Sequence, residues 1–142
     1  MAWNVLLAHA PDEEALAETI VTPLEQAGYT VSYRGTVGVG DSIELAATLA
    51  LESGGPVVLC GTQRAVGSRW VWQLVNAARA TAGRPRVFVV QMERDAYVEA
   101  LARDGVIAPY WEDPAGALQS LIAALRKYYP LETEPGPQAQ SG

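Results

Sequence analysis

The segment "GPVVLC", residues 55–60, decides the fold class of this 142-residue chain. It contains no charged side chain, and two of its six residues are β-branched valines. A fully apolar strand of this kind is typical of the centre of a parallel sheet that is covered on both faces. Short apolar runs alternate with amphipathic segments along the rest of the chain, and this alternation predicts an α/β fold.

Four other runs are predicted to be strands because they are short, apolar and bounded by turn residues. They are "NVLLAH" (4–9), "YTVSYR" (29–34), "RVFVVQ" (86–91) and the weaker "VIAPY" (106–110). We therefore expect a flavodoxin-like, three-layer fold with a central five-stranded parallel sheet in the order 2-1-3-4-5.

Helices are predicted between these strands from capping residues and apolar spacing. The first is expected to begin near Asp12 and to kink or break at Pro23, because proline cannot bond back to Thr19. The last has the clearest signals, with Asp113 at the cap and Pro114 at the first helical position. Others are expected over residues 41–52, from Ser68 onward, and over residues 94–104.

Residues 1–129 have the size and composition of one domain, with 49% apolar and 18% charged residues in the chain. From Pro130 onward, "PLETEPGPQAQSG" has no apolar periodicity and is expected to be a disordered tail or a linker. A net charge of −6 argues against nucleic acid as a partner. The sequence shows no secretion signal and no apolar run of the roughly 20 residues that a bilayer requires, so we expect a soluble, unprocessed, cytoplasmic protein with no membrane partner.

The strand ends do not carry the motifs of several families with this layout. The third predicted strand ends in Leu59, Cys60 and Gly61, where a response-regulator receiver would need an aspartate. The acidic stretch "HAPDEE" after the first strand would repel the phosphate that a flavodoxin binds there. One cysteine and one histidine also make no convincing metal site.

Four segments, taken in order, resemble the Toll/interleukin-1 receptor (TIR) domain family, and the resemblance spans about residues 3–128. They are "VLLAHAPDEEALAETI", "YRGTVGVGDSI", "VVLCGTQRAVGSRWV" and "RVFVVQM". Many TIR domains hydrolyse NAD with a glutamate four residues after the tryptophan of a Ser-x-Trp helix start. Ser68 and Trp70 match this pattern, but Leu74 occupies the glutamate position, so we expect no catalytic residue there.

The resemblance implies a cleft at the strand ends, and we expect His9, Asp12, Ser68, Trp70 and Leu74 to lie around it. No cofactor is expected to be required, although NAD or another nucleotide remains an expected candidate ligand or substrate of this cleft. Among the acids, Asp12, Asp41 and Glu44 are remote candidates to replace the glutamate, and each is better explained as a cap or a surface acid.

The resemblance also implies an interface for self-association or for other TIR or effector domains. Its candidate residues are Arg34, Gly38, Gly40, Asp41 and Trp72. The glycine-rich loop is either a mobile connection or a contact with a neighbouring copy. Trp72 lies about 60° beyond the apolar arc of its helix, so it either lies over a neighbouring helix or anchors another subunit.

The sequence thus predicts a signalling or scaffold module that self-associates, in a bacterial defence or signalling protein. Two alternatives stay open: an NAD hydrolase or cyclase with a rearranged acid, and a nucleotide-binding sensor without turnover.

Overall fold

The computed structural model describes residues 4–10, 13–33, 55–80, 86–102 and 107–131. Its strands are β1 (Asn4–Ala8), β2 (Thr30–Tyr33), β3 (Val57–Gly61), β4 (Val87–Gln91) and β5 (Ile107–Ala108). Its helices are α1 (Glu14–Gln26), α3 (Gln63–Val66), α4 (Arg69–Ala80), the 3₁₀ helix η1 (Val98–Ala100) and α5 (Pro114–Tyr128).

The strands form one parallel sheet in the order β2-β1-β3-β4-β5, which confirms the predicted fold class and strand order. β3 lies in the centre, where Leu7 of β1 pairs with Val58 and Leu59 pairs with Val89 of β4. Every residue of β3 is buried, as expected for the apolar segment "GPVVLC". The strand order reverses between β1 and β3, and this reversal defines where a ligand site can form.

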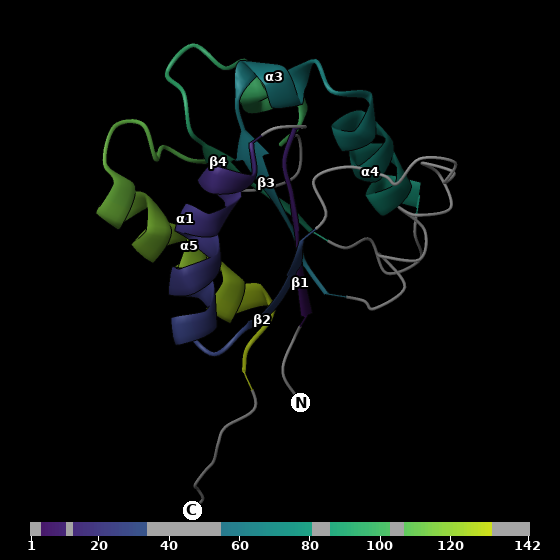
Figure 1. Ribbon diagram of the computed structural model, residues 1–142. Coiled ribbons are helices and arrows are strands. Elements are labelled where there is room, and N and C mark those ends of the chain that lie inside the picture. The colour runs from purple at the N-terminus through teal and green to yellow at the C-terminus, as the bar shows by residue number, and fades with distance from the viewer. Residues whose placement is uncertain (1–3, 11–12, 34–54, 81–85, 103–106, 132–142) are drawn as a thin grey trace, which may run out of the picture.

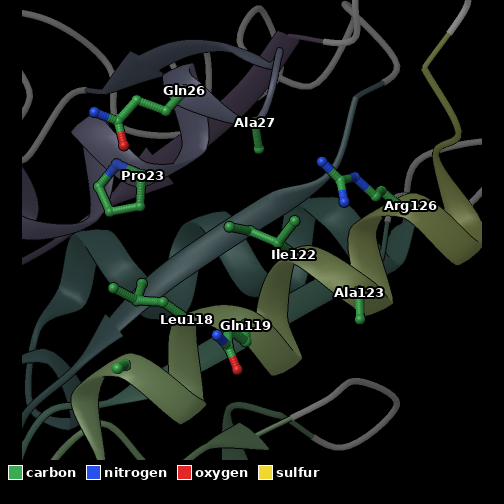
Figure 2. A pocket seen from close by; sticks show the side chains of 9 residues that line it. Pro23, Gln26, Ala27, Leu118, Gln119, Ile122, Ala123 and Arg126 are labelled. Atoms are coloured by element: carbon green, nitrogen blue, oxygen red, sulfur yellow. The ribbon is translucent and has the colours of Figure 1, made fainter.

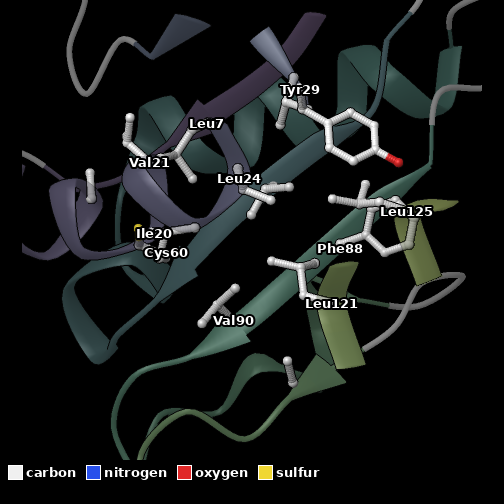
Figure 3. Packing of buried hydrophobic residues seen from close by; sticks show 14 of the residues in the cluster. Leu7, Ile20, Val21, Leu24, Tyr29, Cys60, Phe88, Val90, Leu121 and Leu125 are labelled. Carbon is white, nitrogen blue, oxygen red and sulfur yellow. The ribbon is translucent and has the colours of Figure 1, made fainter. Parts of the chain in front are cut away.

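Helices cover both faces of the sheet, so the architecture has three layers (Figure 1). Alternate residues of each central strand supply two separate cores, because successive side chains of a strand point to opposite faces. Leu6 and Leu59 pack beneath α4 and η1 in the first core. Leu7 and Phe88 pack beneath α1 and α5 in the second, which Figure 3 shows from close by.

Helix α1 begins at Glu14, two residues after the predicted start. The expected break at Pro23 is wrong, because the helix continues through Pro23 to Gln26. Its buried face, with Ile20 and Leu24, holds the last turn against the sheet although one backbone hydrogen bond is lost at the proline. At α5 the prediction is confirmed: Asp113 accepts a hydrogen bond from the Gly116 N–H, and Pro114 opens the helix.

The helix predicted over residues 94–104 is wrong, since the described part of this segment contains only the three residues of η1. The Gln91 side-chain amide donates to the carbonyl oxygens of Glu93, Arg94 and Ala96. The Glu93 and Ala96 carbonyls also accept the Ala96 and Val98 N–H groups, so this segment forms short turns that are tied to the end of β4. Residues 41–52, where another helix is predicted, lie outside the described residues.

The packing continues past residue 129 to Leu131, whose side chain is partly buried against the second core. Leu131 lies over Gly28, which has a φ of 105° and so adopts the left-handed conformation that ends α1. Residues 132–142 lie outside the described part of the chain, so their disorder stays a prediction. None of the described helices is long and apolar enough to cross a membrane.

Gly61 marks the close approach of two layers at the end of β3. A Cβ atom there would lie 2.8 Å from Cγ1 of both Val89 and Val98 and 3.0 Å from the Val90 carbonyl oxygen. We predict that Gly61→Ala lowers the free energy of unfolding by about 1–3 kcal/mol, because the core would be overpacked. Urea denaturation measures this change.

Gly67→Ala is the matched control, since a Cβ at Gly67 would meet nothing closer than 3.7 Å. This variant should match the wild-type stability to within about 0.5 kcal/mol. Equal stability of the Gly61→Ala and Gly67→Ala proteins would contradict the prediction.

Candidate functional site

The candidate site lies at the carboxyl edge of the sheet, where β1 and β3 end side by side and the strand order reverses. Open α/β sheets bind ligands in the crevice at such a point. His9 follows β1 directly, and Thr62 follows β3. Both side chains are buried, together with Glu13 at the start of α1. This edge therefore gathers polar groups in an otherwise apolar interior.

A hydrogen-bond chain joins the two strand ends. The Thr62 hydroxyl donates to Oε1 of Glu13 over 2.7 Å, and Thr62 Oγ1 accepts the Ala65 N–H over 3.0 Å. Thr62 thereby caps α3 and also ties this short helix to the first turn of α1. Glu13 is only 8% exposed, so its carboxylate depends on this hydroxyl for part of its solvation.

Cys60 lies one residue before the end of β3 and points into the second core. Burial, together with a smaller contribution from the nearby negative charge of Glu13, raises the pKa of its thiol to about 12. The thiolate is the reactive form of cysteine. Cys60 is therefore a protonated packing group at neutral pH and is not a nucleophile.

His9 is 1% exposed and turns its ring toward the backbone. Its Nδ1 atom lies 2.7 Å from the Ala10 carbonyl oxygen. A carbonyl can only accept, so Nδ1 carries the proton in this hydrogen bond. His9 therefore lies at the carboxyl edge of the sheet, where the cleft is predicted, but its side chain is buried.

Helix α4 begins as the sequence predicts. The Ser68 hydroxyl oxygen accepts the Val71 N–H over 3.4 Å, and the Ser68 carbonyl accepts the Trp72 N–H. Ser68 is 8% exposed, so its described role is a helix cap. Leu74, about one turn after Trp70 along α4, has no exposed surface and packs in the first core with Leu59.

Trp72 has features of both roles that the sequence left open, packing against its own domain and anchoring another subunit. Its indole N–H donates to the Val66 carbonyl over 2.5 Å, and the ring packs against the first core. The side chain is nevertheless only half-buried, so part of the ring reaches the surface. Its role as an interface anchor stays a prediction.

Several predicted site residues cannot be placed together with these groups. Trp70 belongs to α4, but only its backbone is described. The following lie outside the described residues: Asp12 of the cleft, Glu44, and the interface residues Arg34, Gly38, Gly40 and Asp41. Within the described ranges, no three histidine, cysteine or acidic side chains come together as a metal site would require.

Glu13 and Thr62 are the residues that sequence reasoning missed. A threonine before "QRAV" is a standard capping signal, so Thr62 was detectable as the cap of a short helix. Glu13 was not, because three acids follow one another at residues 12–14 and nothing in their order shows which of them turns inward.

Replacement of Thr62 tests the hydrogen-bond chain. Thr62→Val keeps the shape but removes the hydroxyl, which leaves the buried Glu13 carboxylate without its donor and the Ala65 N–H without its acceptor. We predict a loss of about 2–4 kcal/mol in the free energy of unfolding, measured by urea denaturation. Thr62→Ser keeps the hydroxyl and should lose less than half as much. A Thr62→Val protein as stable as the Thr62→Ser protein would show that the chain contributes nothing.

Comparison with solved structures agrees with this architecture. The chain is similar to a diflavin flavoprotein A3 from Nostoc sp., with a TM-score of 0.53 and 10% sequence identity over 91% of this chain and 99% of the other. At this identity the likeness concerns the fold alone. None of the curated proteins matches the chain.

The family assignment comes from the sequence profile of the TIR domain, which matches residues 5–122. The match begins in β1, includes the edge where Glu13 and Thr62 meet, and extends into α5. It covers most of the chain and agrees with the parallel sheet order 2-1-3-4-5. The chain therefore belongs to the TIR domain family.

Proposed function

We propose that this TIR domain is a scaffold module that acts by associating with copies of itself or with other TIR or effector domains, and that it does not hydrolyse NAD. The observation that carries the proposal is the environment of Leu74. This residue occupies the position at which the family resemblance implies a catalytic glutamate, and it is completely buried in the first core.

The physical chemistry of that position supports the proposal. A leucine side chain can neither carry charge nor accept a hydrogen bond, so it cannot stabilise positive charge that develops on a ribosyl ring. Leu74 also fills space between α4 and the sheet, where Val71, Val75 and Ala78 complete the buried face of the helix. A catalytic carboxylate needs a position that is open to the substrate. The position of Leu74 is enclosed by apolar side chains, where burial of a charged group would be costly.

One observation favours the alternative, an NAD hydrolase with a rearranged acid. Glu13 supplies a carboxylate at the same edge of the sheet, beside the ends of β1 and β3. We give the location of Glu13 less weight than the burial of Leu74. Glu13 is only 8% exposed, and one of its carboxylate oxygens already accepts a hydrogen bond from the Thr62 hydroxyl. A bacterial defence or signalling role would fit either activity, and we retain it as part of the proposal.

Association of the isolated domain should be weak. A single small patch must overcome the loss of translational and rotational freedom by itself. Clustering by a fused or bound partner would raise the effective concentration and drive assembly. The proposal thus makes assembly, and not turnover, the step that a signal would control.

Replacement of Arg34 tests the proposed association. We predict that Arg34→Ala raises the dissociation constant about 5-fold or more, as loss of a charged interface contact does, while the melting temperature stays unchanged. Sedimentation equilibrium measures the association. Arg86→Ala is the control, because Arg86 is an exposed arginine just before β4 whose guanidinium lies over the Tyr128 ring of the same chain. A wild-type chain that remains monomeric at all accessible concentrations, and also when it is clustered on a multivalent support, would overturn the self-association part of the proposal.

A further inference from the structure

Two cations share one exposed aromatic ring at the amino edge of the sheet, the edge opposite the candidate site. Tyr128 is the last residue of α5, and its side chain is exposed. Cζ of Arg86, the residue before β4, lies 3.7 Å from the centre of the Tyr128 ring. Nζ of Lys127 lies 5.3 Å from the same centre. We call Arg86, Lys127 and Tyr128 the basic patch.

The two charges of the basic patch are not balanced by acids in the part of the chain that the structure describes. Neither Arg86 nor Lys127 forms an ion pair with a described residue. The Tyr128 hydroxyl likewise makes no hydrogen bond to a described residue. Like charges that lie close together repel each other, so their convergence costs free energy unless an anion joins them. The patch therefore offers two positive charges and a hydroxyl donor, on a chain whose net charge is −6.

The end of α5 accounts for only one of these cations. A lysine in the last turn is favoured by the partial negative charge at the carboxyl end of a helix. Arg86 comes from another element, so the helix end does not explain it. Arg126 is exposed in the same turn as Lys127, but it faces Ala27 of α1 across the groove that both residues line (Figure 2). The convergence of Arg86 and Lys127 on one ring is thus a product of the tertiary fold.

Tyr129 holds the basic patch in place. Its hydroxyl accepts the Arg86 backbone N–H over 2.9 Å, and its carbonyl oxygen accepts the Tyr29 hydroxyl over 3.0 Å. Its ring is buried and meets the Phe88 ring edge to face, with centroids 6.4 Å apart. The backbones of Arg86 and Tyr128 are therefore fixed to one buried residue, so a partner that binds here loses little affinity to the ordering of these residues.

A second arginine–aromatic pair, at the carboxyl edge, provides a contrast. Cζ of Arg94 lies 5.9 Å from the centre of the Trp111 ring. Arg94 stands between Glu93 and Asp95, and Glu112 follows Trp111 directly. The basic patch has no such neighbours, since no acid lies within three residues of Arg86 or of Tyr128 in the sequence. Of the two pairs, the one at the amino edge is therefore the one that presents positive charge.

We propose that the basic patch binds an acidic peptide segment of a partner protein. Clusters of basic side chains recognise acidic motifs, and arginine and tyrosine are enriched among the residues that contribute most to binding. In an extended segment, side chains two residues apart point to the same side and lie about 7 Å apart. That spacing suits two cations gathered around one ring, and the Tyr128 hydroxyl can donate to either carboxylate.

The charge of the whole chain favours a short segment over a larger polyanion. A membrane surface or a nucleic acid would meet the 16 acids of the chain as well as the patch. Anionic membranes are also bound through clusters of about four to eight basic residues, more than the patch contains. The inference does not rest on the proposed self-association, because it concerns a different partner and residues outside the interface that the family resemblance implies.

Fluorescence anisotropy with a labelled peptide that alternates glutamate and serine tests the inference. The full chain should bind this peptide at least about 10-fold more tightly than the same peptide with glutamine in place of glutamate. Arg86→Ala and Lys127→Ala should each raise the Kd about 5-fold or more, and added salt should weaken binding. Arg94→Ala is the matched control, since it also removes an exposed arginine beside an aromatic ring, and it should bind as the wild-type chain does.

Four results would overturn the inference. They are absence of binding at low ionic strength, equal binding of the glutamate and glutamine peptides, wild-type affinity in both patch variants, and equal weakening by Arg94→Ala. Vesicles that contain phosphatidylserine are tested in parallel, and binding of vesicles but not of the peptide would make the partner a membrane and the inference wrong. A thermal melt verifies each fold. If Arg86→Ala unfolds, Lys127→Ala decides, because the Lys127 side chain is exposed.

Discussion

The central strands are buried on both faces, and this constraint determines where the protein can place any chemistry. Buried residues of β1, β3 and β4 alternate between two apolar cores, so no polar side chain can project from the middle of the sheet without a large desolvation cost. Among the described residues of these three strands, the polar side chains lie at the strand ends. At the carboxyl edge, where the strand order reverses, the chain places Glu13 and Thr62 and joins them by a hydrogen bond of 2.7 Å.

That hydrogen bond lies where many proteins of this architecture bind a ligand, and here it holds the first turn of α1 against the cap of α3. Other side chains considered for the site also have packing or capping contacts: Ser68 caps α4, Cys60 packs in the second core, and Leu74 fills the first core. Side chains that are committed to stability have little freedom to follow a reaction.

Sequence reasoning was most successful where the signal is local and repeated. "GPVVLC" predicts a central strand because burial on both faces requires a continuous apolar run, and the pair Asp113 and Pro114 predicts the start of α5 because capping depends on neighbouring residues. It failed where contacts distant in sequence decide the outcome. The Gln91 amide ties the turns after β4 to the end of that strand, the sheet holds α1 together beyond Pro23, and Thr62 binds Glu13, which the sequence alone does not distinguish from its acidic neighbours.

The central claim is that the domain assembles without turning over NAD, and assembly is the condition under which turnover has to be measured. The most direct measurement is nicotinamide release from NAD by the full chain while it is clustered at high local density on a multivalent support, with the Glu13→Gln protein treated identically. The account predicts no release above the support alone for either protein. Release by the wild-type chain that disappears in Glu13→Gln, with the fold of that variant intact, would contradict it and would assign the catalytic carboxylate to Glu13.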